Sequence, residues 1–355
     1  MKFLRAVFTG LFILIILAVI GAAGFAAWVW QDLHKELAHQ ASSQRLSVSR
    51  GESLEQIMQD LHQMGVLDQT LPLRVYLKVT KSNPVIRSGS YTFPSPISPL
   101  QVLERLKKGG DFARLTIIEG WTRFEIADAM LKVSSFRLKD RKQAMKLFDS
   151  IDLIKDIDAK AKNLEGYLFP DTYFIDGNST AKEVVQDMVK RFRDVWFSKL
   201  KSKAYARGFG AHRVVTEASI IETEAKLKSE RPLVASVIEN RIKKNVPLGV
   251  DSTLIYAAKL AGTWKNDGKV YQSDIDRVSP YNTRNNKGLP PGPVASPGLS
   301  SLEAAINPVS SNFIYYVRNP DRNDGAHNFY ADARSFETGV QALRAWEKKH
   351  PAAVR

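Results

Sequence analysis

The sequence has 355 residues, with 51 Lys and Arg against 37 Asp and Glu, which gives a formal net charge of +14. With 44% hydrophobic and 25% charged residues, the composition is that of a globular protein and excludes a wholly disordered or collagen-like chain. The length predicts at least two domains, and the absence of cysteine excludes disulfides, zinc–thiolate sites and a cysteine nucleophile.

The first element is a long apolar run. Residues 6–30 carry no charge, and a helix of that length, at ~1.5 Å per residue, crosses a ~30 Å hydrocarbon layer. Trp28 and Trp30 lie where interfacial aromatic residues are expected. We predict a single-pass anchor with residues 1–5 in the cytoplasm and the remainder outside. The alternative is a signal peptide cleaved among the small residues 22–27.

Two segments then resemble each other, residues 48–61 and 117–130. Each has a β-branched strand end, a glycine, a Ser53 or Thr122 helix cap, and apolar residues four apart. A strand-like segment (88–93) and a helix-like segment (100–108) lie between them. The pattern predicts a small α+β module over residues 45–133, similar to LysM-type glycan-binding modules. A plain structural repeat is the other interpretation.

Residues 134–350 are predicted to form a second domain of helices with a β-hairpin, so the fold class is α+β. Residues 134–212 are mostly helical by pattern. Within them, residues 163–174 (NLEGYLFPDTYF) are rich in aromatic side chains. They indicate either a packed turn or a wall that lines a substrate site.

One carboxylate stands out on the helix predicted over residues 212–228. At about 100° per residue, Glu222 falls inside the apolar sector, about 20° from Val215, whereas Glu217 and Glu224 fall near the solvent side. Burial should raise the pKa of Glu222, as a general acid near neutral pH requires. The alternative is a structural ion pair with a buried arginine such as Arg241.

The remaining elements follow in order. Pro232 indicates the first turn of a second helix after a Ser229 cap, and residues 251–253 cap a third helix. Residues 279–298 hold five prolines, and they predict a stiff wall against a helix or an ordered linker. Residues 313–318 and 327–330 predict a hairpin, followed by a helix over 335–348. His327 is either a ligand or base, or structural.

No spacing typical of a metal site or phosphate-binding loop appears, so no metal and no cofactor are predicted. Together, the motifs resemble the YceG-like family, whose characterised activity is endolytic murein transglycosylation. The resemblance covers most of the chain beyond the apolar run. It is carried by residues 164–173, 218–222 with Glu224, 229–231, 235–237 with Asn240 and Arg241, Asp251 with Thr253 and Tyr256, 281–283, 288–293, 297–298, 307–308, and His327 with Phe329.

The chain departs from the family pattern at several positions. Ser252 replaces a usual proline, Ala225 a common threonine, and Arg284 a frequent aromatic residue. Ala331 and Phe336 occupy positions where the family usually has Thr and His. The sequence assigns no role to Ser252, Arg284 or Phe336.

The resemblance implies the chemistry and the partners. Glu222 matches the family's catalytic glutamate, and Asn240, Tyr281 and Asn282 are implied to bind substrate. A single carboxylate would cleave the MurNAc–GlcNAc bond within glycan strands, leaving 1,6-anhydro ends and terminating strand elongation. Penicillin-binding synthases are the implied protein partners. A non-catalytic murein-binding scaffold and a hydrolase that leaves reducing ends are the alternatives.

The resemblance also changes how the net charge is interpreted. A basic chain first suggests a nucleic-acid partner. Only Lys2 and Arg5 precede the apolar run, so about +12 remains on the part predicted to lie outside the cytoplasm. No nucleic-acid motif appears in that part. The charge therefore favours attraction to the carboxylates of murein over binding to nucleic acid.

Overall fold

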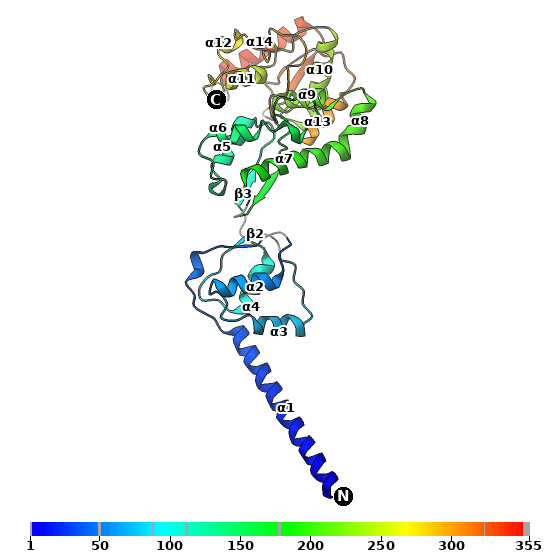
Figure 1. The fold of residues 1–355 in the computed structure, drawn as a ribbon. Coiled ribbons are helices and arrows are strands. Elements are labelled where there is room, and N and C mark those ends of the chain that lie inside the picture. Colours follow the sequence, from blue (N-terminus) through cyan, green and yellow to red (C-terminus); the bar gives the residue numbers. More distant parts are fainter. Residues whose placement is uncertain are drawn as a thin grey trace. The chain divides into compact units, whose positions relative to one another are not determined.

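The structure is a computed structural model that describes residues 2–48, 51–86, 89–110, 113–176, 179–322 and 324–350. The chain divides into two compact units, one of residues 1–113 with 174–179, the other of residues 114–173 with 180–355 (Figure 1). The predicted module ended at residue 133, so this division places residues 114–133 with the second unit instead.

The first unit begins with helix α1 (Lys2–His34), and its segment Phe8–His34 is long and apolar enough to cross a membrane. Its last turns contact the rest of the unit. There Val29 and Leu33 are buried, and the helix packs on α3 (Leu71–Val79) and α4 (Pro99–Lys108). The apolar side chains from Phe8 to Ile20 have no such cover, as a membrane-spanning or signal segment requires.

The body of this unit has the element order strand, helix, helix, strand, helix. Strand β1 (Leu46–Val48) pairs antiparallel with β2 (Gly89–Tyr91), and the two helices α2 (Leu54–Gln63) and α3 lie between them in sequence. Ser53 caps α2 by accepting the N–H of Gln56, as predicted. Helix α4 follows its Ser98 cap. Ser88, the start of the predicted second strand, lies outside the described residues.

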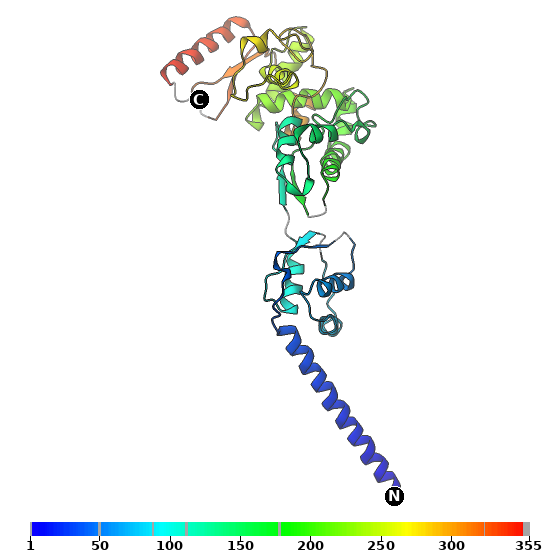
Figure 2. The ribbon, with the colours of Figure 1, turned by 60° about the vertical axis from the view of Figure 1, so that its left-hand side comes forward.

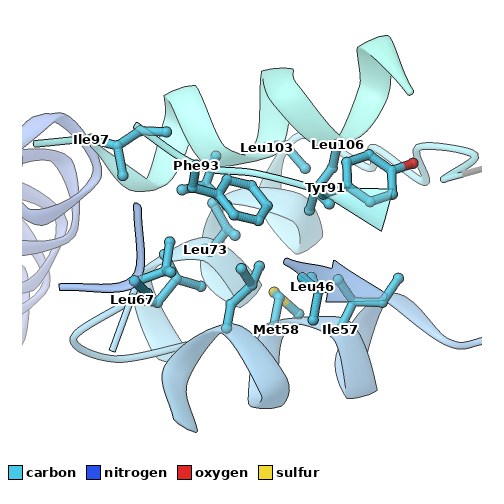
Figure 3. Packing of buried hydrophobic residues seen from close by; sticks show 14 of the residues in the cluster. Leu46, Ile57, Met58, Leu67, Leu73, Tyr91, Phe93, Ile97, Leu103 and Leu106 are labelled. Carbon is cyan, nitrogen blue, oxygen red and sulfur yellow. The ribbon is translucent and has the colours of Figure 1, made fainter. Parts of the chain in front are cut away.

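A single apolar core holds these elements together (Figure 3). Ile57 and Leu61 from α2, four residues apart, face Leu103 and Leu106 from α4, and all four are buried. Tyr91 of β2 closes one side of the cluster. The helical spacing of these residues is what allows two short helices and a two-stranded sheet to bury one common face.

The second unit is mostly helical. It contains residues 114–116 of strand β3 (Ala113–Thr116) and residues 172–173 of strand β4 (Thr172–Ile175). The two strands pair in a small sheet, and the Thr116 and Thr172 hydroxyls lie 3.1 Å apart. The helices that follow β3 and β4 are α5 (Arg123–Leu131), α6 (Arg141–Leu147), α7 (Ala181–Val195) and α8 (Lys201–Ala206), with a π-helical turn at Trp196–Leu200. Short 3₁₀ turns occupy Ala41–Ser43 in the first unit and Ser134–Phe136, Ile151–Leu153 and Lys228–Glu230 in the second.

The C-terminal half is built around α9 (Ala211–Glu224), on which α10 (Arg231–Lys243) and α13 (Leu299–Ile306) pack. Helices α11 (Asp251–Leu260) and α12 (Gln272–Ile275) come between α10 and α13 in the chain. Helix α10 begins at Arg231, and its N-cap is Glu230 and not the predicted Ser229, which lies in the preceding 3₁₀ turn. Pro232 lies in the first turn of the helix, as predicted.

The predicted hairpin is confirmed as β5 (Tyr315–Arg318) and β6 (His327–Tyr330), in the register Tyr315 opposite Tyr330 and Arg318 opposite His327. Helix α14 (Ala333–Lys349) packs on both strands, and Figure 2 shows this red helix beside the hairpin. Phe336 of α14 stacks on Tyr315 at 4.7 Å between ring centroids. This contact fixes the helix to one face of the hairpin.

Candidate active site

Helix α9 is buried on nearly all sides along its central turns. Every residue from Val214 to Ile221 is buried, including Glu217, whose side chain is only 1% exposed. The prediction that Glu217 faces solvent was therefore wrong. A helical wheel places a residue relative to one apolar sector, but here α10, α13 and residues 293–298 cover several sides of α9.

The two carboxylates at the C-terminal end of α9 have different surroundings. Glu222 has a side chain only 4% exposed. Its Oε1 accepts a hydrogen bond from Arg231 at 2.5 Å, and its Oε2 accepts the Gly298 N–H at 2.9 Å. Burial raises the pKa of the Glu222 carboxyl, whereas the Gly298 N–H and the Arg231 guanidinium favour its charged form. The side chain thus forms a closed, buried ion pair.

The arginine in this pair differs from the one the sequence suggested. Arg231, at the start of α10, is only 5% exposed and also lies 3.7 Å from Glu119. Arg241, the suggested partner, instead donates to the Pro247 and Ile314 carbonyls. The two arginines belong to the same helix, so periodicity alone does not choose between them.

Gly298 is held against Glu222 by a neighbouring loop. The Gly120 N–H donates to the Ser296 carbonyl at 2.9 Å, and the Ser296 N–H donates to Trp121 at 2.7 Å. A side chain at Gly298 would collide with Glu119, since an added Cβ would lie 2.0 Å from its Oε1. A larger residue would therefore have to displace the end of the Glu119 side chain, which is 40% exposed. The backbone N–H of Gly298 reaches the buried carboxylate of Glu222.

Glu224, two residues further along α9, lines a cavity of about 440 Å³. The Tyr316 hydroxyl donates to its Oε2 at 2.8 Å. Burial raises the pKa of the Glu224 carboxyl, and nearby Asp251 adds to the increase, while Tyr316 and His327 lower it. Glu224 therefore combines a raised pKa with access to a cavity, which is what a general acid needs. The sequence had placed it on the solvent side.

The walls of this cavity bring together residues that the sequence could not place. Arg284 donates to Asp251 at 2.6 Å, and both line the cavity. Phe336 reaches it through its stack on Tyr315, and Ser252 lies close enough to Glu224 to influence its pKa. Three of the five departures from the family pattern, Ser252, Arg284 and Phe336, thus lie around Glu224 and its cavity. The lining residues are Glu224, Val237, Ile238, Arg241, Leu248, Gly249, Val250, Asp251, Arg284, Tyr315, Tyr316 and Phe336.

His327 does not line the cavity but packs on Tyr316, which does. Its N–H and Nδ1 contact the two oxygens of Glu230 at 2.9 and 2.8 Å. Its ring meets the Tyr316 ring edge to face at 5.3 Å. Glu230 therefore ties the hairpin to the start of α10, and His327 packs on the tyrosine that donates to Glu224. Of the two interpretations left open for His327, these contacts favour the structural one.

The structure does not bring the other three predicted residues together around Glu222. The Asn240 amide donates to the Ser311 and Phe313 carbonyls at 2.8 and 3.0 Å. The fully buried Asn282 donates to the Ile275 and Arg277 carbonyls. Both amides hold backbone turns in these positions. Their roles in substrate binding stay predictions.

Tyr281 lies elsewhere, in a second cavity of about 340 Å³. This cavity is also lined by Pro291, Gly292 and Pro293, so the proline-rich segment does form a wall, as predicted. The same segment is fixed to α9, because the Val294 N–H donates to Ser219 Oγ at 3.0 Å. In the described part of the chain, no cluster of His, Asp and Glu has the grouping that would hold a metal ion.

Comparison with known proteins places the chain in a family. A family model described as the YceG-like family matches residues 46–342, and the chain belongs to this family. A protein of Bacillus subtilis named endolytic murein transglycosylase is 30% identical over 77% of this chain and 78% of its own length. A protein of the same name from Streptococcus pneumoniae is 28% identical over 86% of this chain, which spans 60% of that relative.

A solved structure shares the fold. The crystal structure of a yceG-like protein from Listeria monocytogenes aligns with a TM-score of 0.58 and 28% sequence identity. The alignment covers 83% of this chain and 97% of that one. The similarity thus extends over both units and is not confined to one motif.

Proposed function

We propose that this protein is a membrane-anchored endolytic murein transglycosylase that cleaves the MurNAc–GlcNAc bond within nascent glycan strands and so terminates their elongation. The observation that carries the proposal is the Glu224 carboxyl, whose pKa is raised by burial and which lines a cavity of about 440 Å³. The names of the Bacillus and Streptococcus relatives support the reaction class.

The proposed reaction uses one carboxyl group twice. The protonated acid donates its proton to the glycosidic oxygen as the bond from C1 of the muramic residue breaks. The resulting carboxylate then accepts the proton of that residue's C6 hydroxyl as its oxygen bonds to C1. The 1,6-anhydro ring closes without water, and the carboxyl group is protonated again. A raised pKa favours the protonated starting state.

Two glutamates at the end of α9 compete for this role. The family resemblance assigns it to Glu222, whose two oxygens are both taken by Arg231 and Gly298. The geometry favours Glu224, because its side chain lines the cavity and Tyr316 orients one of its oxygens. We therefore propose Glu224 as the acid and base, with Glu222 as the competing candidate that the same assay tests.

A second candidate function, hydrolysis, is favoured by one observation. Asp251 lines the same cavity as Glu224 and is half exposed. Glycosidases that use water need two positioned carboxylates. In the structure Arg284 donates to Asp251 Oδ1 at 2.6 Å. A carboxylate that activates water must be ionised, so this contact does not separate the two routes, and the ends released from murein decide between them.

The proposal extends to the rest of the chain. Helix α1 is proposed as a retained single-pass anchor with its N-terminus in the cytoplasm, which leaves the rest of the first unit and all of the second on the outer side of the inner membrane. The strand–helix–helix–strand order of the first unit supports a LysM-like role in holding glycan. Penicillin-binding synthases are proposed as partners, since strand termination requires access to strands under synthesis.

Mass spectrometry of digested murein tests the function. The purified full chain is incubated with purified murein, and the released ends are analysed. Transglycosylation gives anhydro ends that are one water lighter than the reducing ends produced by hydrolysis. A scaffold gives neither product. Anhydro ends are the expected result, and reducing ends or the absence of any product would overturn the proposal.

A further inference from the structure

The second cavity lies in the same unit as the first and shares no lining residue with it. Its volume of about 340 Å³ falls in the ~300–1,000 Å³ range of pockets that bury small ligands. It is formed by the turn at 161–165, by His212 at the start of α9, by Tyr256 and Leu260 of α11, and by the proline-rich segment.

Its walls are aromatic and rigid. The Tyr256 and Tyr281 rings lie 4.9 Å apart and are tilted by 55°. Pro291 and Pro293 flank Gly292 along the same cavity. Gly166, in the turn beside it, lies so close to Pro293 that an added Cβ would be 2.6 Å from the proline ring. The cavity is therefore preformed, and a ligand would not have to order its walls.

Polar groups reach the cavity in fixed orientations. His212 Nδ1 lies 2.7 Å from Asp158 Oδ2, and Asp158 also accepts the Tyr167 hydroxyl at 2.5 Å and the Lys160 N–H. This network fixes the imidazole ring. No hydrogen bond from its Nε2 to another described residue is found. The carboxylate thus orients the imidazole through one ring nitrogen, and the other ring nitrogen is left for a ligand.

The turn at 161–165 also holds two of its own side chains, Asn163 and Glu165, in place. Asn163, which lines the cavity, accepts the Glu165 N–H with its Oδ1 at 2.9 Å, so this contact does not use its amide NH₂ group. Both oxygens of Glu165 lie within 3.2 Å of the Arg123 N–H at the start of α5. Burial raises the pKa of Glu165 to about 7, so below that pH the carboxyl adds no charge to the cavity.

We propose that this cavity is a saccharide-binding subsite for one N-acetylhexosamine ring of the glycan, separate from the cavity of Glu224. The proposal depends on the substrate class of the proposed function. Tyrosine and proline faces suit the C–H face of a pyranose ring, and the His212 and Asn163 groups suit its hydroxyl and acetamido groups. Lys162 is the one lysine or arginine among the lining residues, so the cavity is poorly suited to a phosphate or a nucleotide.

The test monitors His212 directly. The full chain in detergent micelles is labelled with ¹⁵N at its six histidines, and the His212 imidazole signal is identified by its loss in His212→Gln. The probe is N-acetylchitotetraose, which carries no lactyl or peptide carboxylate. Mass spectra of the recovered probe confirm that it stays intact. Saturable movement of the His212 signal with probe concentration is the expected result.

Two variants change the walls of the cavity and leave His212, Asn163 and Glu165 in place. Tyr281→Ala removes an aromatic wall, and Gly292→Val fills space, because a Cβ at Gly292 points to within 3.4 Å of the Tyr281 hydroxyl. We expect each to weaken binding on the order of tenfold. Tyr205→Ala is the matched control, since this half-exposed tyrosine lines neither cavity. It should bind as the wild type does.

An unmoved His212 signal, or unchanged affinity in both cavity variants, would overturn the inference. Movement confined to His62 would place the probe on the first unit and also overturn it. Release of anhydro ends is measured separately on the same preparations. A protein that releases anhydro ends but does not bind the probe at His212 refutes the subsite alone. A protein that binds the probe and releases no anhydro ends refutes the proposed function alone.

Discussion

Replacing each of the two glutamates at the end of α9 by glutamine separates a structural carboxylate from a catalytic one. Glu222→Gln removes the nearer of the two carboxylates beside Arg231, whose side chain is only 5% exposed. Removing one partner of a buried ion pair typically costs about 3–5 kcal/mol. At roughly 2–4 °C per kcal/mol for a unit of this size, the melting temperature should fall by on the order of 10 °C.

Glu224→Gln should behave in the opposite way. Its amide oxygen can still accept the Tyr316 hydroxyl, so the melting temperature should change by only a few degrees. Loss of the acid should lower the rate of anhydro-end release at least about a hundredfold. The assay follows anhydro ends from purified murein by mass spectrometry, alongside thermal unfolding of the same full-length samples.

A third variant isolates the ion pair. The double replacement Glu222→Leu with Arg231→Met removes both buried charges of this pair, so it should recover much of the stability that Glu222→Gln loses. The two assignments are distinguished by which glutamine variant loses stability and which one loses activity. If Glu222→Gln melts like the wild type and releases no anhydro ends, while Glu224→Gln remains active, the geometric assignment is refuted and Glu222 is the acid.

Three further predictions follow from other contacts in the second unit. Tyr316→Phe removes a hydrogen bond that favours the charged form of Glu224, so the pKa of Glu224 should rise. The alkaline limb of the profile of kcat/KM against pH should then move to higher pH, and an unmoved limb would contradict the role of Glu224. Burial raises the pKa of Glu217 from 4.5 to about 8, so the folded chain binds more protons between these values and the free energy of unfolding should fall as pH rises through this window. In Glu217→Gln, the free energy of unfolding measured in urea should fall less between pH 5.5 and pH 8.5 than it does in the wild type. An equal fall in both proteins would show that Glu217 does not cause the pH dependence. Gly166→Ala should lower the free energy of unfolding, measured in urea titrations, by about 2–4 kcal/mol. The reasons are that φ at Gly166 is +81° and that the new Cβ would lie 2.6–2.7 Å from Pro293 and Val215. A wild-type value would show that the turn adjusts to the larger residue.

The local elements were determined largely by the sequence. The caps at Ser53 and Thr122 and the hairpin of β5 and β6 occur where the sequence predicts them, because each depends on residues close together in the chain. The apolar run likewise forms one continuous helix. The family resemblance was also visible in the sequence, because its motifs are short contiguous segments.

Only the tertiary structure decided the surroundings of the carboxylates. Glu217 is buried and Glu224 lines a cavity, although both lie outside the apolar sector, because separate segments of the chain cover α9 from several directions. The partner of Glu222 is Arg231 because the start of α10 reaches it. Ion pairs and cavities depend on contacts between segments far apart in sequence, and a helical period does not contain that information.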